Sequence, residues 1–216
     1  MLFNIKQIMK PHIITIVSFI LLLTSCISEK NIIRKYYTLE IQEDTYNIAP
    51  DTLNLIPGKC EIGQVNINPV YEKNQIVNRN KSHEITYYMY HQWAVRPSEA
   101  IREMLNEYMQ NRGLFENVST RFSRSIPDYR FETSVNGLEI VEIDKSFSAH
   151  VNLDFMLILN TSDSILIRHQ ADRTEPLKKK DMNLFAREVS NILFEELEVF
   201  TELIRGKEEI FYSSEW

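Results

Sequence analysis

Residues 149–160 carry the strongest constraint on how this 216-residue chain can fold. Every second residue there is large and apolar: Val151, Leu153, Phe155, Leu157 and Leu159. Successive side chains of a strand point to opposite faces, so a period of two places all five on one buried face. Turn-forming residues follow at 160–164, and residues 165–171 are typical of a second strand, which predicts an antiparallel hairpin.

Two other segments have the helical period instead. In residues 97–113 the apolar positions recur three and four residues apart, Pro97 stands at the opening with Ser98 as a candidate cap, and Gly113 ends the pattern. Residues 181–204 carry a longer apolar stripe, with Asp181 as a candidate N-cap and Gly206 as the end. The sequence therefore predicts two amphipathic helices.

The remaining strands are shorter and more polar. We expect them at residues 36–41, 60–70, 74–80, 84–94, 115–122 and 129–143, with a polar loop over 42–59. Gly63 is a candidate bulge, and the pair Asn136–Gly137 is a candidate bulge or turn. The fold class that follows is α/β, a mixed, three-layer-like β-sheet of about seven strands with two amphipathic helices packed on it.

The N-terminal residues have the organisation of a lipoprotein leader. Lys6 and Lys10 precede an apolar stretch over residues 13–23, which is too short to span ~30 Å of hydrocarbon comfortably. Leu23-Thr24-Ser25-Cys26 resembles the bacterial lipobox, in which the cysteine is lipidated and becomes the first residue. We expect a signal peptide over 1–25 and lipidation, including palmitate, at Cys26; an uncleaved membrane anchor is the alternative.

The mature chain then comprises a lipidated tether at 26–35, one domain at 36–206 and a tail at 207–216. Cys60 is the other cysteine, so no intrachain disulfide remains once Cys26 carries lipid. Loss of two leader lysines takes the formal net charge from −6 to −8. With no basic patch, this composition argues against nucleic acid as a partner.

Several stretches together resemble one family in their order and spacing. They are "RKYYTLEI", "IGQVNINPVYEKNQIVNRN", "ITYYMYHQWAVRPSEAIREML" and "DYRFETSVNGLEI". The family is the ABC-type transport auxiliary lipoprotein family, which includes the paraquat-inducible lipoprotein, and the resemblance covers residues 34–204. The chain departs from it at "WAVRP", where the family more often has an acid and a proline, so no role carries over to Arg96.

The resemblance implies a three-layer α/β domain in a periplasmic lipoprotein beside a lipid-transport machine. Its partners would be an ABC permease and ATPase with a substrate-binding protein of the mammalian-cell-entry (MCE) type. The lipoprotein would lie on the outer membrane, held by its lipid anchor, and dock the apparatus there without catalysis. The resemblance also allows a homo-oligomer.

The sequence contains no motif for catalysis, a cofactor or a metal. A Gly-rich phosphate loop and a G-x-S-x-G nucleophile elbow are both missing. The histidines at 83, 91, 150 and 169 form no metal-ligand spacing. Glu139, Glu142, Asp144 and Asp154 could approach one another in a sheet, but acids in β-structure are usually solvated. We expect neither catalytic residues nor a cofactor.

The aromatic run at residues 87–93 is the candidate interaction site. Strict alternation would send Tyr87, Met89, His91 and Trp93 to one face and the intervening residues to the other. One interpretation is that these faces pack into the core. The other is that Tyr88, Tyr90 and Trp93 line an apolar groove or a protein interface, where Tyr and Trp are favoured.

Two functions from different classes remain. The first is a non-catalytic docking lipoprotein of an MCE/ABC lipid-transport system. The second is a periplasmic carrier that itself binds a lipid or another hydrophobic ligand, which a buried apolar cavity would favour. The missing nucleophile motif argues against a third class, a hydrolase.

Overall fold

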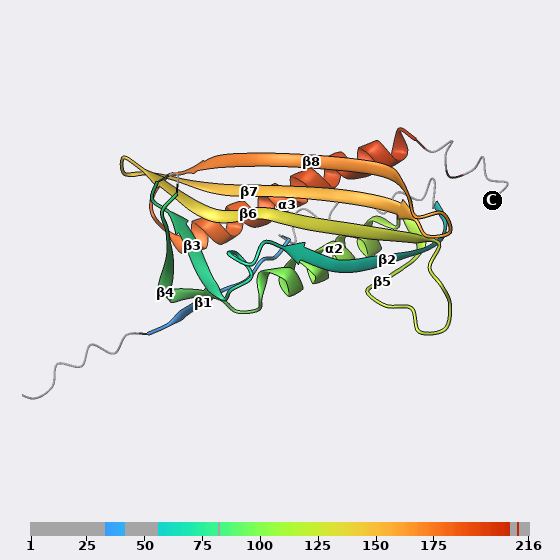
Figure 1. Cartoon of the computed structure of the whole chain (residues 1–216), viewed down its shortest axis with the longest axis horizontal. Coiled ribbons are helices and arrows are strands. Elements are labelled where there is room, and N and C mark those ends of the chain that lie inside the picture. The colour runs from blue at the N-terminus through green and yellow to red at the C-terminus, as the bar shows by residue number, and fades with distance from the viewer. Residues whose placement is uncertain (1–32, 42–55, 82, 208–210, 212–216) are drawn as a thin grey trace, which may run out of the picture. The chain divides into compact units, whose positions relative to one another are not determined.

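The longest strand, β6 (Tyr129–Ile143), lies inside one eight-stranded sheet in the described part of the chain (Figure 1). The computed structural model describes residues 33–41, 56–81, 83–207 and 211. Its elements are β1 (Lys35–Tyr37), β2 (Ile56–Ile67), β3 (Gln75–Arg79), β4 (Ile85–Trp93), α2 (Pro97–Arg112), β5 (Phe115–Ser119), β6 (Tyr129–Ile143), β7 (Ser146–Leu159), β8 (Ser164–Leu177) and α3 (Met182–Arg205).

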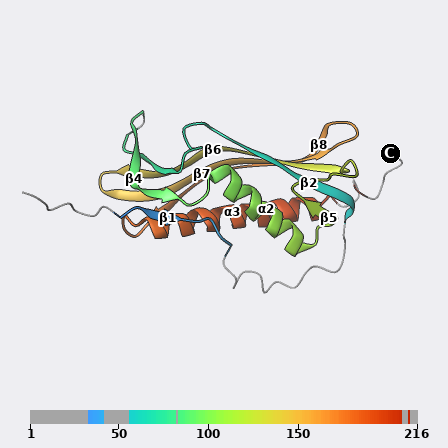
Figure 2. The ribbon, with the colours of Figure 1, turned by 90° about the horizontal axis from the view of Figure 1, so that it is seen from below.

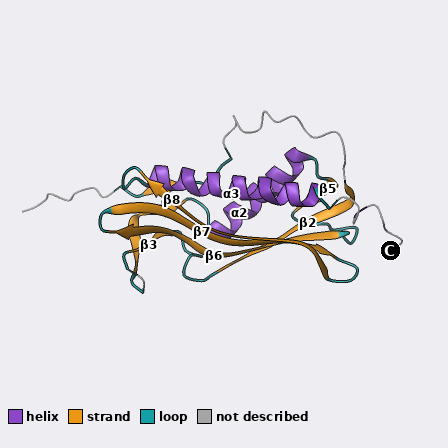
Figure 3. Ribbon diagram, turned by 90° about the horizontal axis from the view of Figure 1, so that it is seen from above, coloured by secondary structure: helices purple, strands orange, loops and turns teal. Residues whose placement is uncertain are grey.

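Strand β6 organises the sheet because it is long enough to pair with two strands along one edge. Its first half pairs in parallel with β2, which continues to β5, and its second half pairs in parallel with β3. Strand β3 then pairs with β4 and β4 with β1. The other edge of β6 pairs antiparallel with β7, and β7 with β8. Both helices lie on one face of this sheet (Figures 2 and 3).

The core lies between the long hairpin and α3. The alternating apolar residues of β7 are each at most 6% exposed, and the apolar stripe of α3 covers them. The Phe200 ring on α3 lies 5.1 Å from that of Phe131 on β6 and 5.9 Å from that of Phe155 on β7, centroid to centroid. These three rings join the helix to two central strands.

The ends of the helices follow local chemistry. The Asp181 carboxylate accepts two backbone N–H bonds of 2.9 and 3.3 Å at the start of α3, which confirms the predicted cap. The prediction for Ser98 is wrong: α2 begins after Arg96, and the Ser98 hydroxyl donates to Glu72 at 2.6 Å instead. Gly113 ends α2 at φ 61°, a left-handed conformation that glycine adopts at little cost.

The predicted fold class, a mixed α/β sheet with two amphipathic helices, is confirmed. The sheet has eight strands rather than about seven, and in the described residues both helices cover the same face. Strand β8 continues to Leu177, beyond the predicted end at 171. The sequence did not indicate this extension because the second half of the strand buries few apolar side chains and so lacks a clear hydrophobic pattern. The bulge at Asn136–Gly137 is confirmed by a register shift against β7.

The predicted signal peptide, Cys26 and residues 42–55 lie outside the described residues. Within the part of the chain that is described, no helix is both long and apolar enough to cross a membrane.

Replacing Phe200 with alanine is expected to lower the free energy of unfolding by about 3–5 kcal/mol, because it removes the ring that joins α3 to β6 and β7. Denaturant unfolding followed by circular dichroism measures this loss. The neighbouring Val199, 45% exposed on the same helix, is the matched control, and its change to alanine should cost less than about 1 kcal/mol. Equal losses at the two positions would contradict this account of the core.

Candidate functional site

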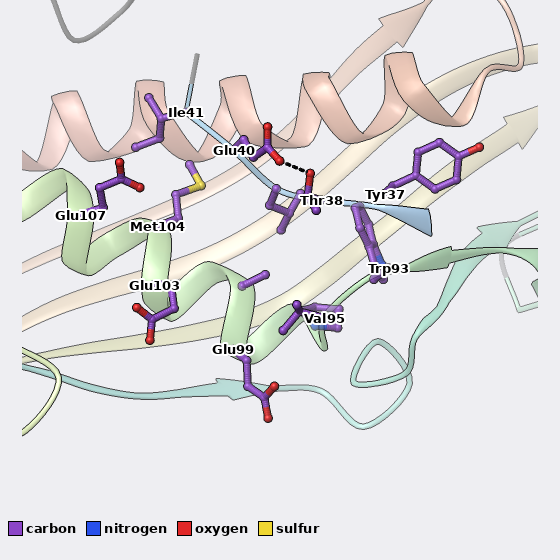
Figure 4. Close-up of a pocket in the computed structure, with 13 residues that line it drawn as sticks. Tyr37, Thr38, Glu40, Ile41, Trp93, Val95, Glu99, Glu103, Met104 and Glu107 are labelled. Atoms are coloured by element: carbon purple, nitrogen blue, oxygen red, sulfur yellow. Dashed lines mark hydrogen bonds between the residues drawn. The ribbon is translucent and has the colours of Figure 1, made fainter. Parts of the chain in front are cut away.

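A groove lies between α2 and the chain that follows β1. Its cavity volume is about 660 Å³. Residues 38–41 run along one side and the first three turns of α2 along the other (Figure 4). The apolar part of the lining comes from Leu39, Ile41, Trp93, Val95 and Met104. A groove of this size and composition is typical of a site for an apolar segment or ligand.

Trp93 forms a fixed wall of this groove. Its indole is 3% exposed and packs on Phe185 of α3 with ring centroids 5.7 Å apart. The backbone on either side is held as well, since the Trp93 N–H donates to the Asn74 carbonyl at 2.6 Å and the Ala94 N–H donates to the Tyr37 carbonyl at 2.8 Å. The groove is therefore built on ordered strands and a packed helix.

The outer rim of the groove is acidic. Glu99, Glu103 and Glu107 are exposed on α2 at intervals of four residues, and so follow one another along one side of the helix. Arg96 pairs with Glu99 at 2.5 Å, whereas no ion pair of Glu103 or Glu107 is found among the described residues. Like charges one turn apart repel each other. The rim is thus suited to a positively charged partner.

The three predicted interface residues do not come together. Trp93 lines the groove, Tyr88 is half-buried beneath the Lys180 ammonium group, 5.4 Å from the ring, and Tyr90 is exposed. Strict alternation fails because β4 shifts its register against β3 between the pairs Gln75–Gln92 and Val77–Tyr87. Extra residues of β4 bulge out there and separate the aromatic side chains.

Sequence reasoning missed most of the groove. Leu39 and Ile41 belong to a segment that the sequence predicts as a strand. In the structure β1 ends before them, and both side chains are buried beside α2 and α3. The signal that could have found the rim was the repeat of glutamates at 99, 103 and 107, which is visible in the sequence. Nothing in the sequence alone places that repeat next to residues 38–41.

Three of the four carboxylates considered for catalysis are paired with a cation, and the fourth, Asp144, is exposed. Glu142 accepts from Lys180 at 2.7 Å, Asp154 from Arg168 at 2.5 Å, and Glu139 from Arg79 at 2.7 Å. These pairs hold elements of the sheet together and leave the acids separate. Among the described residues, no group of three or more His, Cys, Asp or Glu side chains could hold a metal ion.

Glu139 is the most deeply buried of these acids, at 1% exposure on the face away from the helices. Burial opposes its charge, but hydrogen bonds from His150, Arg79 and Tyr71 outweigh this effect, and the pKa of Glu139 is lowered. The contact with Glu139, together with one to Asp172 at 2.8 Å, raises the pKa of His150 against the effect of burial. Gly137 leaves room for this imidazole, since a Cβ there would lie 2.9 Å from the ring.

Comparison with solved structures identifies the class of fold. The protein XCC0632 of Xanthomonas campestris, from the DUF330 family, superimposes with a TM-score of 0.65 at 15% identity, covering 81% of this chain and 98% of that one. A second structure, titled an uncharacterized protein, gives a TM-score of 0.59 at 13% identity over 79% of this chain and 99% of its own. At such identities the similarity shows a shared fold alone.

The family follows from the sequence comparison. The profile of the ABC-type transport auxiliary lipoprotein component family matches residues 37–197, and the chain belongs to this family. As an auxiliary lipoprotein component, it acts with an ABC-type transport system at the cell envelope. The search of curated proteins gave no match.

The pair His150–Glu139 predicts a pH dependence of stability. The folded-state pKa of His150 is raised, so its contribution is full below the ordinary histidine pKa and is lost as pH rises through the higher folded value. Glu139, with a lowered pKa, stays ionised across this range. His150→Gln should therefore lower the free energy of unfolding more at pH ~5.5 than at pH ~8.5.

Denaturant unfolding at the two pH values measures the difference. His91 is the control with the opposite sign, because burial and the charge of Lys35 lower its pKa and make its protonation destabilising. The cost of His91→Gln should therefore be smaller in acid. A cost of His150→Gln that does not change with pH would refute the charged pair.

Proposed function

We propose that this protein is a non-catalytic, lipid-anchored auxiliary subunit that docks an MCE/ABC lipid-transport apparatus at the periplasmic face of the outer membrane. Family membership supports a role beside an ABC-type transporter. The lipobox-like sequence ending in Cys26 supports a lipid anchor. The groove between residues 38–41 and α2 provides a surface that a partner can occupy.

The observation that carries the docking role is the combination of an apolar floor with an acidic rim. Val95, which is 45% exposed, offers apolar contact in front of the buried Trp93 and Met104, while Glu99, Glu103 and Glu107 follow the same groove along α2. The partner that fits is an amphipathic helix of the transport apparatus, with an apolar face toward Trp93 and basic residues toward the glutamates. Glutamates one turn apart on α2 match basic side chains spaced by one turn on that helix.

The alternative function is a carrier that holds a lipid in this groove. Its volume of about 660 Å³ and its apolar floor would accept an acyl chain. The rim argues against a phospholipid, because Glu103 and Glu107, which pair with no cation among the described residues, repel a phosphate headgroup. Docking of a basic helix therefore fits the groove better than lipid carriage.

The anchor is tested by membrane fractionation of cell envelopes. Cys26→Ala should move the protein out of the outer-membrane fraction, because the thiol that carries the lipid is gone. Cys60→Ala is the matched control: Cys60 is fully buried, and its loss should leave the protein with the membrane. Release of both variants, or of neither, would contradict lipidation at Cys26.

Docking is tested with a photo-crosslinking amino acid at Val95, which lines the groove and is 45% exposed. Irradiated envelopes should yield a crosslink to the MCE-type protein of the same system, identified by mass spectrometry. Replacing Glu99, Glu103 and Glu107 by glutamine should reduce this crosslink several-fold. The same charge change at the exposed residues Glu84, Glu116 and Asp144, as Gln, Gln and Asn, should leave it unchanged.

Crosslinks from Val95 to phospholipid, with no transport component, would replace docking by the carrier function. An equal reduction of the Val95 crosslink in the two triple variants would show that total charge, rather than the rim, controls the interaction.

A further inference from the structure

One edge of the sheet exposes large side chains that the docking groove does not use. On the two strands of this edge, β1 and β4, Tyr36 is 58% exposed, Met89 66%, Tyr87 37% and Tyr90 38%. Clustered apolar and aromatic exposure of this kind marks an interaction site rather than ordinary surface.

Tyr36 and Tyr87 face away from the helices, and Met89 and Tyr90 are exposed beside them on β4. Tyr37 and Trp93 are paired across β1 and β4, and Trp93 packs on Phe185 of α3. Side chains alternate along a strand, so Tyr36 points to the opposite face. Tyr87 lies on that face as well: its hydroxyl donates to the Val70 carbonyl at 3.4 Å, and the adjacent Tyr71 hydroxyl donates to Glu139 on the face away from the helices.

Basic groups accompany the aromatic residues. Arg34 and Lys35 are exposed at the start of β1, and the Lys73 ammonium group lies 4.4 Å from the centre of the Tyr87 ring. The whole chain has a formal net charge of −6, so this edge differs in sign from the average surface. Tyrosine beside lysine and arginine is the composition found where proteins meet the interface of a bilayer.

The position of the edge in the chain points to the same partner. Nine residues lie between Cys26 and Tyr36, and even a fully extended chain spans at most about 35 Å from one to the other. If Cys26 carries the lipid, β1 is the first element beyond the anchor among the residues that the structure describes. The edge formed by β1 and β4 is then held close to the bilayer.

A second copy of the chain is a poorer fit to this edge. Strand β1 has three residues and includes Lys35, and short, charged edge strands are a common device against strand pairing between molecules. The exposed groups are tyrosines and a methionine, which suit a mixed polar and apolar surface.

From these observations we infer that the β1–β4 edge rests on the lipid bilayer, with Tyr36, Tyr87, Met89 and Tyr90 at the headgroup–acyl boundary and Arg34, Lys35 and Lys73 against the phosphates. This inference rests on the proposed lipidation of Cys26. Contact between this edge and the bilayer fixes the orientation of the domain on the membrane, which a flexible lipid tether alone does not do. The acidic rim of α2 lies outside this edge and remains available to a partner.

The test uses the full-length lipidated protein in vesicles of phosphatidylethanolamine and phosphatidylglycerol. Met89→Cys and, separately, Tyr90→Cys are labelled with the environment-sensitive dye NBD. Val199→Cys, 45% exposed on α3, is the matched control position. The wild type should take up little dye, because Cys60 is fully buried and Cys26 carries lipid.

Brominated acyl chains should quench the dye at positions 89 and 90 several-fold more than at 199. Equal quenching at the three positions, in protein that floats with the vesicles, overturns the seating while the lipid anchor stands. The dye at position 89 could instead be shielded from water without being quenched by brominated lipid. If that shielding depends on protein concentration, the edge mediates self-association. Protein that does not float with vesicles overturns the anchor and the seating together.

Discussion

The structure depends on the burial of one face of the β6–β7 pair against α3. The alternating residues of β7 supply an apolar surface that is stable only when it is covered, and the stripe of α3 covers it. Phe200 meets both Phe131 and Phe155, so the helix fixes the two strands together. All other elements are attached to this unit, because β6 also provides the edge to which β2 and β3 pair.

The groove follows from that arrangement. Both helices lie on one face, and α2 leaves space beside the chain that follows β1. Trp93 closes one end of that space because it packs on Phe185, a residue of the same helix that covers β7. The groove is thus a consequence of how two helices share one sheet face, and its acidic rim comes from the solvent side of α2.

The opposite face is stabilised by charge rather than by a helix. Glu139 is buried there with Arg79, Tyr71 and His150, and these hydrogen bonds keep it ionised in spite of burial. This cluster also explains why the acidic residues in the sequence did not by themselves indicate a catalytic site. Glu139, Glu142 and Asp154 each meet a cation from another strand or loop, and that pairing depends on the register of the sheet.

The sequence by itself determined the two helices, the central hairpin, the Asp181 cap and the fold class, because each rests on a local period or a local hydrogen bond. The order of the strands, the common face of the helices and the groove were decided by tertiary packing. The aromatic run shows the reason: alternation predicts faces only in a regular strand, and the pairing of β4 with β3 shifts register between Tyr87 and Gln92.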